Sequence, residues 1–121
     1  MADPIEYIEQ FAPGLDVTFN VGTDVRAGRV VELTGSRSIG ETSGASAKVV
    51  GVAARTAKTG DSVVVKHGKW QRLIAAGPIA AGDRVASASQ GRVATATTGA
   101  TIGLAITSAA DGATASIRLD Q

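Results

Sequence analysis

An internal repeat is the feature of this chain that most constrains its fold. Seven positions return 52 residues later: Val50-Gly-Val-Ala53, Ala57, Gly60 and Val65 match Ile102-Gly-Leu-Ala105, Ala109, Gly112 and Ile117. Two further matches lie 54 residues apart: Ala27-Gly28 with Ala81-Gly82, and Ile39 with Val93. The repeated glycines indicate positive φ or close backbone approach. Each half supplies strands that cannot bury their apolar face alone, whereas two halves closing on each other can.

Alternation of apolar and polar residues predicts strands in both halves. Leu15–Asn20 is apolar at positions 15, 17 and 19, and Thr114–Leu119 places Ala115, Ile117 and Leu119 on one face. Turn residues separate the other expected strands, which are Gly28–Leu33, Lys48–Ala53, Ser62–Lys66, Lys69–Ala75, Arg84–Ser87, Arg92–Thr97 and Thr101–Thr107. We therefore expect an all-β fold, a small sandwich or barrel of two pseudo-repeated halves (about 25–68 and 79–120) within one domain, 15–121.

The stretch from Thr34 to Ser46, TGSRSIGETSGAS, has the glycine spacing of a nucleotide-binding P-loop. Glu41 stands where the phosphate-binding lysine belongs, and a carboxylate there would repel phosphate. The glycines and valines that follow disfavour the helix that a P-loop requires. In the second half this stretch corresponds to Ser87–Ala100, which carries no phosphate motif. We expect a loop or hairpin tip of the repeat, which absorbs the two-residue difference between the offsets.

The sequence of residues 1–14 predicts a short N-terminal arm or helix. Asp3-Pro-Ile-Glu6 is a helix-capping pattern, and Pro13-Gly14 would end the segment. A helix of about ten residues is marginal in isolation, so this one needs a surface to pack against. Its apolar side chains are candidate interface residues: Ile5, Tyr7, Ile8 and Phe11.

Composition predicts a thin core. Hydrophobic residues make up 44% of the 121 residues, but alanine is the commonest of them and only four residues are aromatic. Burial of an alanine stabilises a fold much less than burial of a valine or leucine. A small domain with such a core often gains stability by association, so we expect oligomerisation.

Charge is unevenly distributed along the chain. Residues 1–25 carry five acidic and no basic residues, whereas the remainder carries twelve basic and six acidic residues. Two solvated surfaces that differ by chance would explain this, and so would an acidic arm that lies on a basic neighbour.

Little in the chain indicates catalysis, a cofactor or a metal. There is no cysteine, and the one histidine, His67, sits in an expected hairpin tip. No apolar run has the length of a membrane span and no signal peptide is visible, so we expect synthesis in a cytoplasm and no membrane partner. The basic region 48–72 contains a single aromatic residue, Trp70, which is too few for single-stranded nucleic acid. Trp70 would instead cover the thin core or form a subunit contact.

The order of several short motifs resembles a known family. They are Phe11-Ala-Pro-Gly-Leu-Asp-Val-Thr-Phe19, Ala27-Gly-Arg-Val-Val31, Val49-Val-Gly-Val-Ala53, Ala57-Lys-Thr-Gly-Asp61, Ile79-Ala-Ala-Gly-Asp-Arg-Val85, Gly91-Arg-Val-Ala-Thr95, Ile102-Gly-Leu-Ala105 and Ala110-Asp-Gly-Ala-Thr-Ala-Ser-Ile-Arg-Leu119. From about residue 11 to the end, the chain is similar to the tailed-bacteriophage head decoration proteins, also called capsid cement proteins. Residues Asp3–Gln10 are less typical of that family.

The resemblance implies a β-rich structural protein on the outer surface of the phage head. Such proteins commonly bind as homotrimers, bridge neighbouring major capsid subunits and have no catalytic residues. Under this reading the major capsid protein and a second copy of the chain are the partners, and the arm residues and Trp70 are the candidate contacts. A carbohydrate- or surface-binding β module of a phage structural protein, with Trp70 and Tyr7 as stacking residues, is the alternative. An ATP-dependent enzyme would rest on the Thr34–Ser46 stretch alone.

Overall fold

The computed structural model describes residues 17–66, 70–97 and 100–120, and nearly all of their regular structure is β-strand. The strands are β1 (Val17–Val21), β2 (Val30–Gly35), β3 (Ser38–Glu41), β4 (Val49–Ala53), β5 (Ser62–Lys66), β6 (Trp70–Ile74), β7 (Arg84–Ala88), β8 (Arg92–Thr95), β9 (Gly103–Ala105) and β10 (Thr114–Leu119). A short 3-10 turn, η1 (Ser89–Gly91), joins β7 to β8. The all-β prediction is confirmed.

The first half of the chain, β1 to β5, closes into a barrel with the strand order β1-β3-β2-β4-β5. β5 returns to β1 in antiparallel pairing from Val17↔Val65 to Asn20↔Ser62, and β1 also pairs β3 in parallel. Closure leaves fewer unpaired sheet edges, which are the parts of a sheet most prone to aggregation. The barrel core consists mainly of valine, and its buried members are Val21, Val25, Val31, Ile39, Ala53, Ala57, Val63 and Val65.

The second half, β6 to β10, repeats this arrangement. Its sheet has the order β6-β10-β9-β7-β8, and β8 comes back to β6 through the parallel bridge Ala75↔Val93. That bridge lies 54 residues after the Val21↔Ile39 pair of the first half. Likewise, the bridge Val25↔Ala57 has its counterpart in Ile79↔Ala109. The repeat in the sequence is therefore a repeat of strand pairing.

The repeated glycines include turn positions that need positive φ. Gly28 and its counterpart Gly82 have φ values of 77° and 93°, which a residue with a Cβ rarely adopts. Their N–H groups donate to equivalent carbonyl oxygens, those of Ala53 at 2.9 Å and Ala105 at 2.8 Å. Each turn thus ties the start of one strand to the end of another within its own half.

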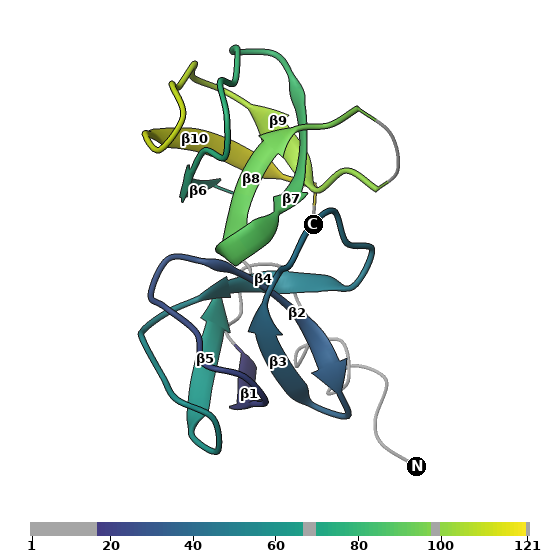
Figure 1. Ribbon diagram of the computed structural model, residues 1–121, viewed down its shortest axis with the longest axis vertical. Helices are drawn as coiled ribbons and strands as arrows, with labels where there is room; N and C mark the ends of the chain where they lie inside the picture. Colours follow the sequence, from purple (N-terminus) through teal and green to yellow (C-terminus); the bar gives the residue numbers. More distant parts are fainter. Residues whose placement is uncertain (1–16, 67–69, 98–99, 121) are drawn as a thin grey trace, which may run out of the picture.

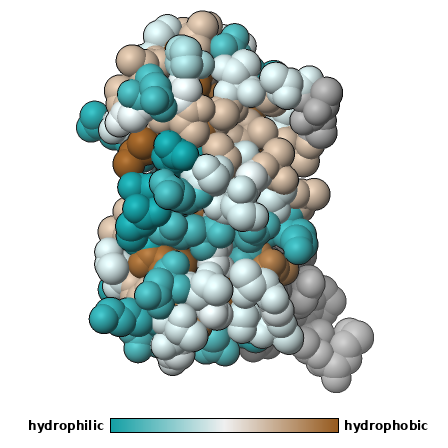
Figure 2. Space-filling view, in the orientation of Figure 1, coloured by the Kyte–Doolittle hydropathy of each residue, from teal (hydrophilic) through white to brown (hydrophobic). Residues whose placement is uncertain are grey.

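The two halves stack along the long axis of the molecule (Figure 1). Val30 on β2 and Val52 on β4 face out of the first barrel and are buried in the core of the second half, beside residues such as Leu73, Val85 and Ile117. The second core is thus completed by side chains from the first half. On the face drawn in Figure 2, mildly apolar surface lies mostly over the second half, and the first half is mainly polar.

Two sequence expectations need correction. Ser38–Glu41, expected to belong to a loop or hairpin tip, is the strand β3 of a hairpin, because Ile39 faces into the first core just as Val93 faces into the second. The expected strand Thr101–Thr107 is shorter, since only Gly103–Ala105 belongs to β9. The expected arm, residues 1–14, lies outside the described residues.

Candidate interaction surface

The stretch that resembles a P-loop forms a β-hairpin. β2 and β3 pair in antiparallel fashion across a tip at Ser36 and Arg37, and Arg37 has a φ of 53°. Glu41 accepts hydrogen bonds from the backbone N–H and the guanidinium of Arg26, with Nη2–Oε1 at 2.8 Å. Glu41, the residue in the lysine position, is therefore half of an ion pair that links the end of β3 to the connection between β1 and β2. This arrangement gives the stretch a structural role, in line with the expected hairpin tip.

The surroundings of Glu41 shift its pKa in two opposing directions. Partial burial raises the pKa, whereas the hydrogen bonds from Arg26 and the positive charge of that side chain lower it. The net shift of the Glu41 pKa is downward, and the pKa of Arg26 is raised by the same contact. Both groups are therefore held in their charged forms in the folded protein.

A small polar cluster joins the two halves at their junction. Thr42 and Ser87 are the buried polar side chains among the described residues, at 1% and 3% exposure. Thr42 Oγ1 donates to the carbonyl oxygen of Ala88 at 2.7 Å. Ser87 Oγ donates to the Gly44 carbonyl oxygen at 2.8 Å and accepts the N–H of Ser46 at 2.9 Å. Because both hydroxyls have partners, their burial adds directional contacts to the apolar packing of Val30 and Val52.

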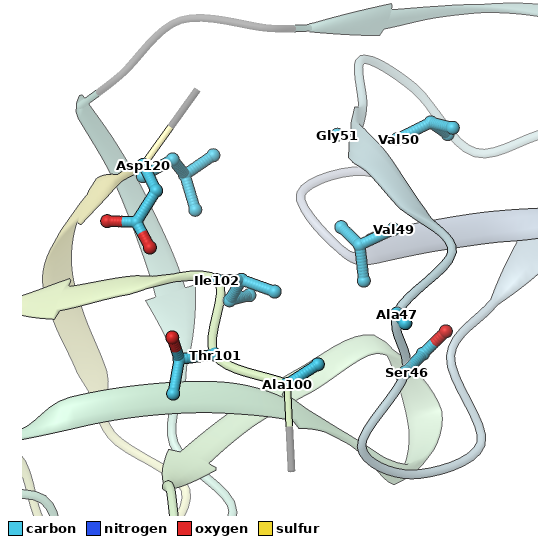
Figure 3. A pocket seen from close by; sticks show the side chains of 10 residues that line it. Ser46, Ala47, Val49, Val50, Gly51, Ala100, Thr101, Ile102 and Asp120 are labelled. Carbon is cyan, nitrogen blue, oxygen red and sulfur yellow. The ribbon is translucent and has the colours of Figure 1, made fainter.

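The junction also contains a shallow cleft of about 170 Å³. One wall is formed by residues at and before the start of β4, and the other by residues next to β9 and at the end of β10. The lining residues are Ser46, Ala47, Val49, Val50 and Gly51 on the first wall, and Ala100, Thr101, Ile102, Leu119 and Asp120 on the second. Val49 and Ile102 point toward each other across it (Figure 3). Both side chains also pack against the core of the second half. The cleft is therefore a gap within the interface between the two halves.

An exposed apolar and basic surface covers the outer side of β6, β10 and β9. Trp70 is 66% exposed and Ile106 is 40% exposed, and these are the exposed large hydrophobic side chains among the described residues. Inward-facing Leu73, Ile117 and Ala105 are fully buried on the same strands. We define the β10 face as this outer surface, which consists of Trp70, Arg72, Leu104, Ile106, Ser116 and Arg118.

Pairing across the strands makes this face continuous. Arg118 on β10 lies opposite Trp70 on β6 and also opposite Leu104 on β9. Ser116 lies opposite Arg72, and its carbonyl oxygen accepts the N–H of Ile106 at 2.9 Å. Neighbouring residues on one side of a sheet are in reach of one another, so the six side chains form one patch.

The predicted interface residues divide into two groups. Trp70 does not cover the core, because its side chain is on the outer face of β6. Ile5, Tyr7, Ile8, Phe11 and also His67 lie outside the described residues. Sequence reasoning missed Leu104, Ile106 and Arg118 as neighbours of Trp70, although the alternation in Thr114–Leu119 already placed Arg118 opposite to the buried side chains.

In the described part of the chain, no group of three or more His, Cys, Asp or Glu side chains could hold a metal ion. Within the same residues no helix is long and apolar enough to cross a membrane.

Comparison with known proteins identifies the family. A family model described as phage cement protein matches residues 8–121. The chain belongs to the phage cement protein family. The suspected resemblance is thereby confirmed, and this cement protein is a structural protein of the phage head. No protein in the curated collections matches the sequence.

The fold of this cement protein is also found in a solved structure. It is similar to the N base of the head fiber protein gp8.5 of bacteriophage phi29, with a TM-score of 0.69 and 18% sequence identity. The match covers 88% of this chain and 93% of that one. At this identity the likeness establishes a common fold, and it extends over both halves of the cement protein.

Proposed function

We propose that this cement protein decorates the outer surface of a tailed-phage head as a homotrimer, and that it stabilises the head by bridging neighbouring major capsid subunits. It acts as a structural component and not as an enzyme, and it is made in the host cytoplasm before it joins the virion. The major capsid protein and other copies of the chain are its partners, with no role for nucleic acid or membranes.

The join between the two halves is the observation that carries this proposal. A brace must transmit force from one contact to another, and two halves joined only by a flexible linker would not. Here Val30 and Val52 are buried in the core of the second half, and Thr42 and Ser87 add hydrogen bonds across the same junction. Packed interiors of this kind transmit strain because they have few voids. The two halves therefore act as one stiff unit.

Weak individual contacts are sufficient for such a role. A trimer that contacts several capsid subunits gains avidity, because the second and third contacts form within an already bound molecule. Decoration at many equivalent positions on the shell would then resist the outward pressure of packaged DNA. Family membership supports the location on the head, and the packed join between the two halves supports the mechanical role.

Sedimentation of the purified protein with undecorated heads, built from the capsid protein of the same phage, tests the proposal. We expect saturable binding of three copies per site and a higher temperature for loss of packaged DNA. A failure to bind would overturn the proposed location. Binding that saturates but leaves the release temperature unchanged would overturn the bracing role.

The exposed side chain of Trp70 supports one alternative function, that of a carbohydrate- or surface-binding module. An exposed indole can stack on a sugar ring, but in the described residues Trp70 is surrounded by aliphatic and basic side chains without a second aromatic ring. A glycan array probed with the full chain separates the two functions. A specific signal that Trp70→Ala abolishes would favour the alternative.

A further inference from the structure

The repeat gives one residue of the β10 face, Leu104, a counterpart in the first half that the second half covers. Leu104 on β9 is the counterpart of Val52 on β4, 52 residues earlier. Val52 faces outward from its barrel and is 4% exposed, because the second half of the chain covers it. Leu104 faces outward in the same way, but no part of the described chain buries it to that extent. The outward position is thus covered at Val52 and left open at Leu104, whereas Ala54 and Lys66, the counterparts of Ile106 and Arg118, are exposed in the first half as well.

The β10 face also exposes large apolar side chains close together. Trp70 and Ile106 border Leu104 and Arg118, so large apolar area is concentrated on one side of one sheet. Contiguous apolar patches on a soluble protein mark interaction sites, whereas scattered single side chains do not. Exposed tryptophan and arginine are moreover the side chains that contribute most at protein interfaces.

Charge indicates which part of a partner this face receives. Arg72 and Arg118 both lie on it, and among the described residues neither has an ion-pair partner. Residues 1–14 of the chain carry three acidic residues, Asp3, Glu6 and Glu9, and no basic ones, and they include the apolar Ile5, Tyr7, Ile8 and Phe11. An acidic and apolar segment complements a surface that is basic and apolar.

We propose that a second copy of this chain docks on the β10 face, with its acidic N-terminal residues toward Arg72 and Arg118. The contact joins two different surfaces, so it is heterologous, and three copies related by a three-fold axis close it into a ring. This inference rests on the self-association in the proposed function and names the surface that forms it. It also makes the N-terminal apolar residues a contact between copies.

Trp70 is a direct reporter, because it is the single tryptophan of the chain. We expect its emission to shift to shorter wavelength, and its quenching by acrylamide to fall, as the protein concentration rises through the association range. Sedimentation velocity over the same concentrations should show growth to a discrete larger species. A chain that stays monomeric, or one that associates while Trp70 remains equally quenchable, would overturn the proposal.

Three substitutions locate the contact. Arg118→Glu and Ile106→Ala retain Trp70, so fluorescence and sedimentation both measure their association. Trp70→Ala removes the fluorophore, so sedimentation alone measures the association of that variant. Each should raise the dissociation constant at least about tenfold, since central interface residues dominate binding. Lys58→Glu makes a comparable charge change on the first half and should leave association unchanged. All four sites are exposed, so circular dichroism should show folded variants.

A mixing experiment tests the direction of the contact. The Arg118→Glu chain is mixed with a chain that carries Glu6→Lys and Glu9→Lys. We expect the mixture to associate more strongly than either variant alone, because reversed charges then face each other across copies. Equal behaviour of the mixture and the separate variants would overturn the assignment of the N-terminal residues. These assays contain no heads, so their failure is distinct from a failure to bind the capsid.

Discussion

Gly51 and Gly103 occupy the same position in the two halves, and each lies against a carbonyl oxygen of the neighbouring strand. A Cβ at Gly103 would be 2.5 Å from the carbonyl oxygen of Arg118, and one at Gly51 would clash with that of Lys66. Lys66 and Arg118 are themselves 52 residues apart. The repeat thus preserves a close approach of two strands, which only glycine allows.

Alanine at either glycine should therefore destabilise the protein. We expect Gly103→Ala and Gly51→Ala each to lower the free energy of unfolding by about 1–3 kcal/mol, because the backbone must shift to make room. Gly51 also has a φ of 151°, so its variant should be the more severe. Urea denaturation followed by circular dichroism measures both.

Gly44→Ala is the matched control for these variants. Gly44 lies in the loop between β3 and β4, and a Cβ there would meet nothing within 4 Å. Its variant should stay within about 0.5 kcal/mol of the parent. An equal loss of stability in all three variants would show that the close approach is not the cause.

The alternation of apolar and polar residues predicts most of the strands of this fold. The internal repeat also indicates a strand that the alternation misses. The bounds of Ser62–Lys66 and Thr114–Leu119 agree with β5 and β10, because strict alternation or a valine run is bounded by turn residues. β3 was missed because Ser38, Gly40 and Glu41 have low strand propensity. β3 forms because Ile39 is buried in the core. The match of Ile39 with Val93, which lies in an expected strand, indicated this in the sequence.

The candidate surface was less accessible to sequence reasoning. Trp70 stood out by its residue type, but Leu104 and Ile106 look like core residues in any linear pattern. Their exposure depends on which outer face the other half covers, and the stacking of the halves decides that. Val30 and Val52 show the converse, since outward-facing valines of the first half become core residues of the second half.

Removal of the Ser87 hydroxyl tests the polar cluster at the junction. Ser87→Ala leaves the N–H of Ser46 and the carbonyl oxygen of Gly44 without their shared partner in a buried site. We expect a loss of about 1–3 kcal/mol in the free energy of unfolding, measured by urea denaturation. Ser36→Ala, at the exposed tip of the β2–β3 hairpin, makes the same chemical change and should cost less than about 0.5 kcal/mol. A similar effect at both positions would contradict a special role for the junction.

The ion pair of Glu41 with Arg26 should make stability depend on acid pH. The folded-state pKa of Glu41 lies below its ordinary value of 4.5, so the carboxylate stabilises the fold fully above that value. This contribution is lost as the pH falls through the folded-state pKa. The stability difference between the parent and Glu41→Gln should therefore be constant near neutral pH and shrink below about pH 4.5.

Arg26→Gln provides the partner control for that titration. It removes the group that lowers the Glu41 pKa, so its difference from the parent should shrink over the same pH range. Thermal unfolding between pH 3 and pH 8, at low and high salt, measures both variants. A difference that persists unchanged at the lowest pH would show that the ion pair does not contribute the pH dependence.

Val52 and Leu104 form a matched pair that separates folding from association. Val52→Ala opens a gap in the shared core and should lower the free energy of unfolding by about 1–3 kcal/mol. Leu104 is only partly buried on the β10 face, so Leu104→Ala should cost less in unfolding of the dilute monomer. It should instead weaken self-association, which Val52→Ala should leave unchanged in the folded protein. Urea denaturation at low concentration and sedimentation at high concentration give the two quantities, and the reverse order of effects would show that the β10 face is not an interface.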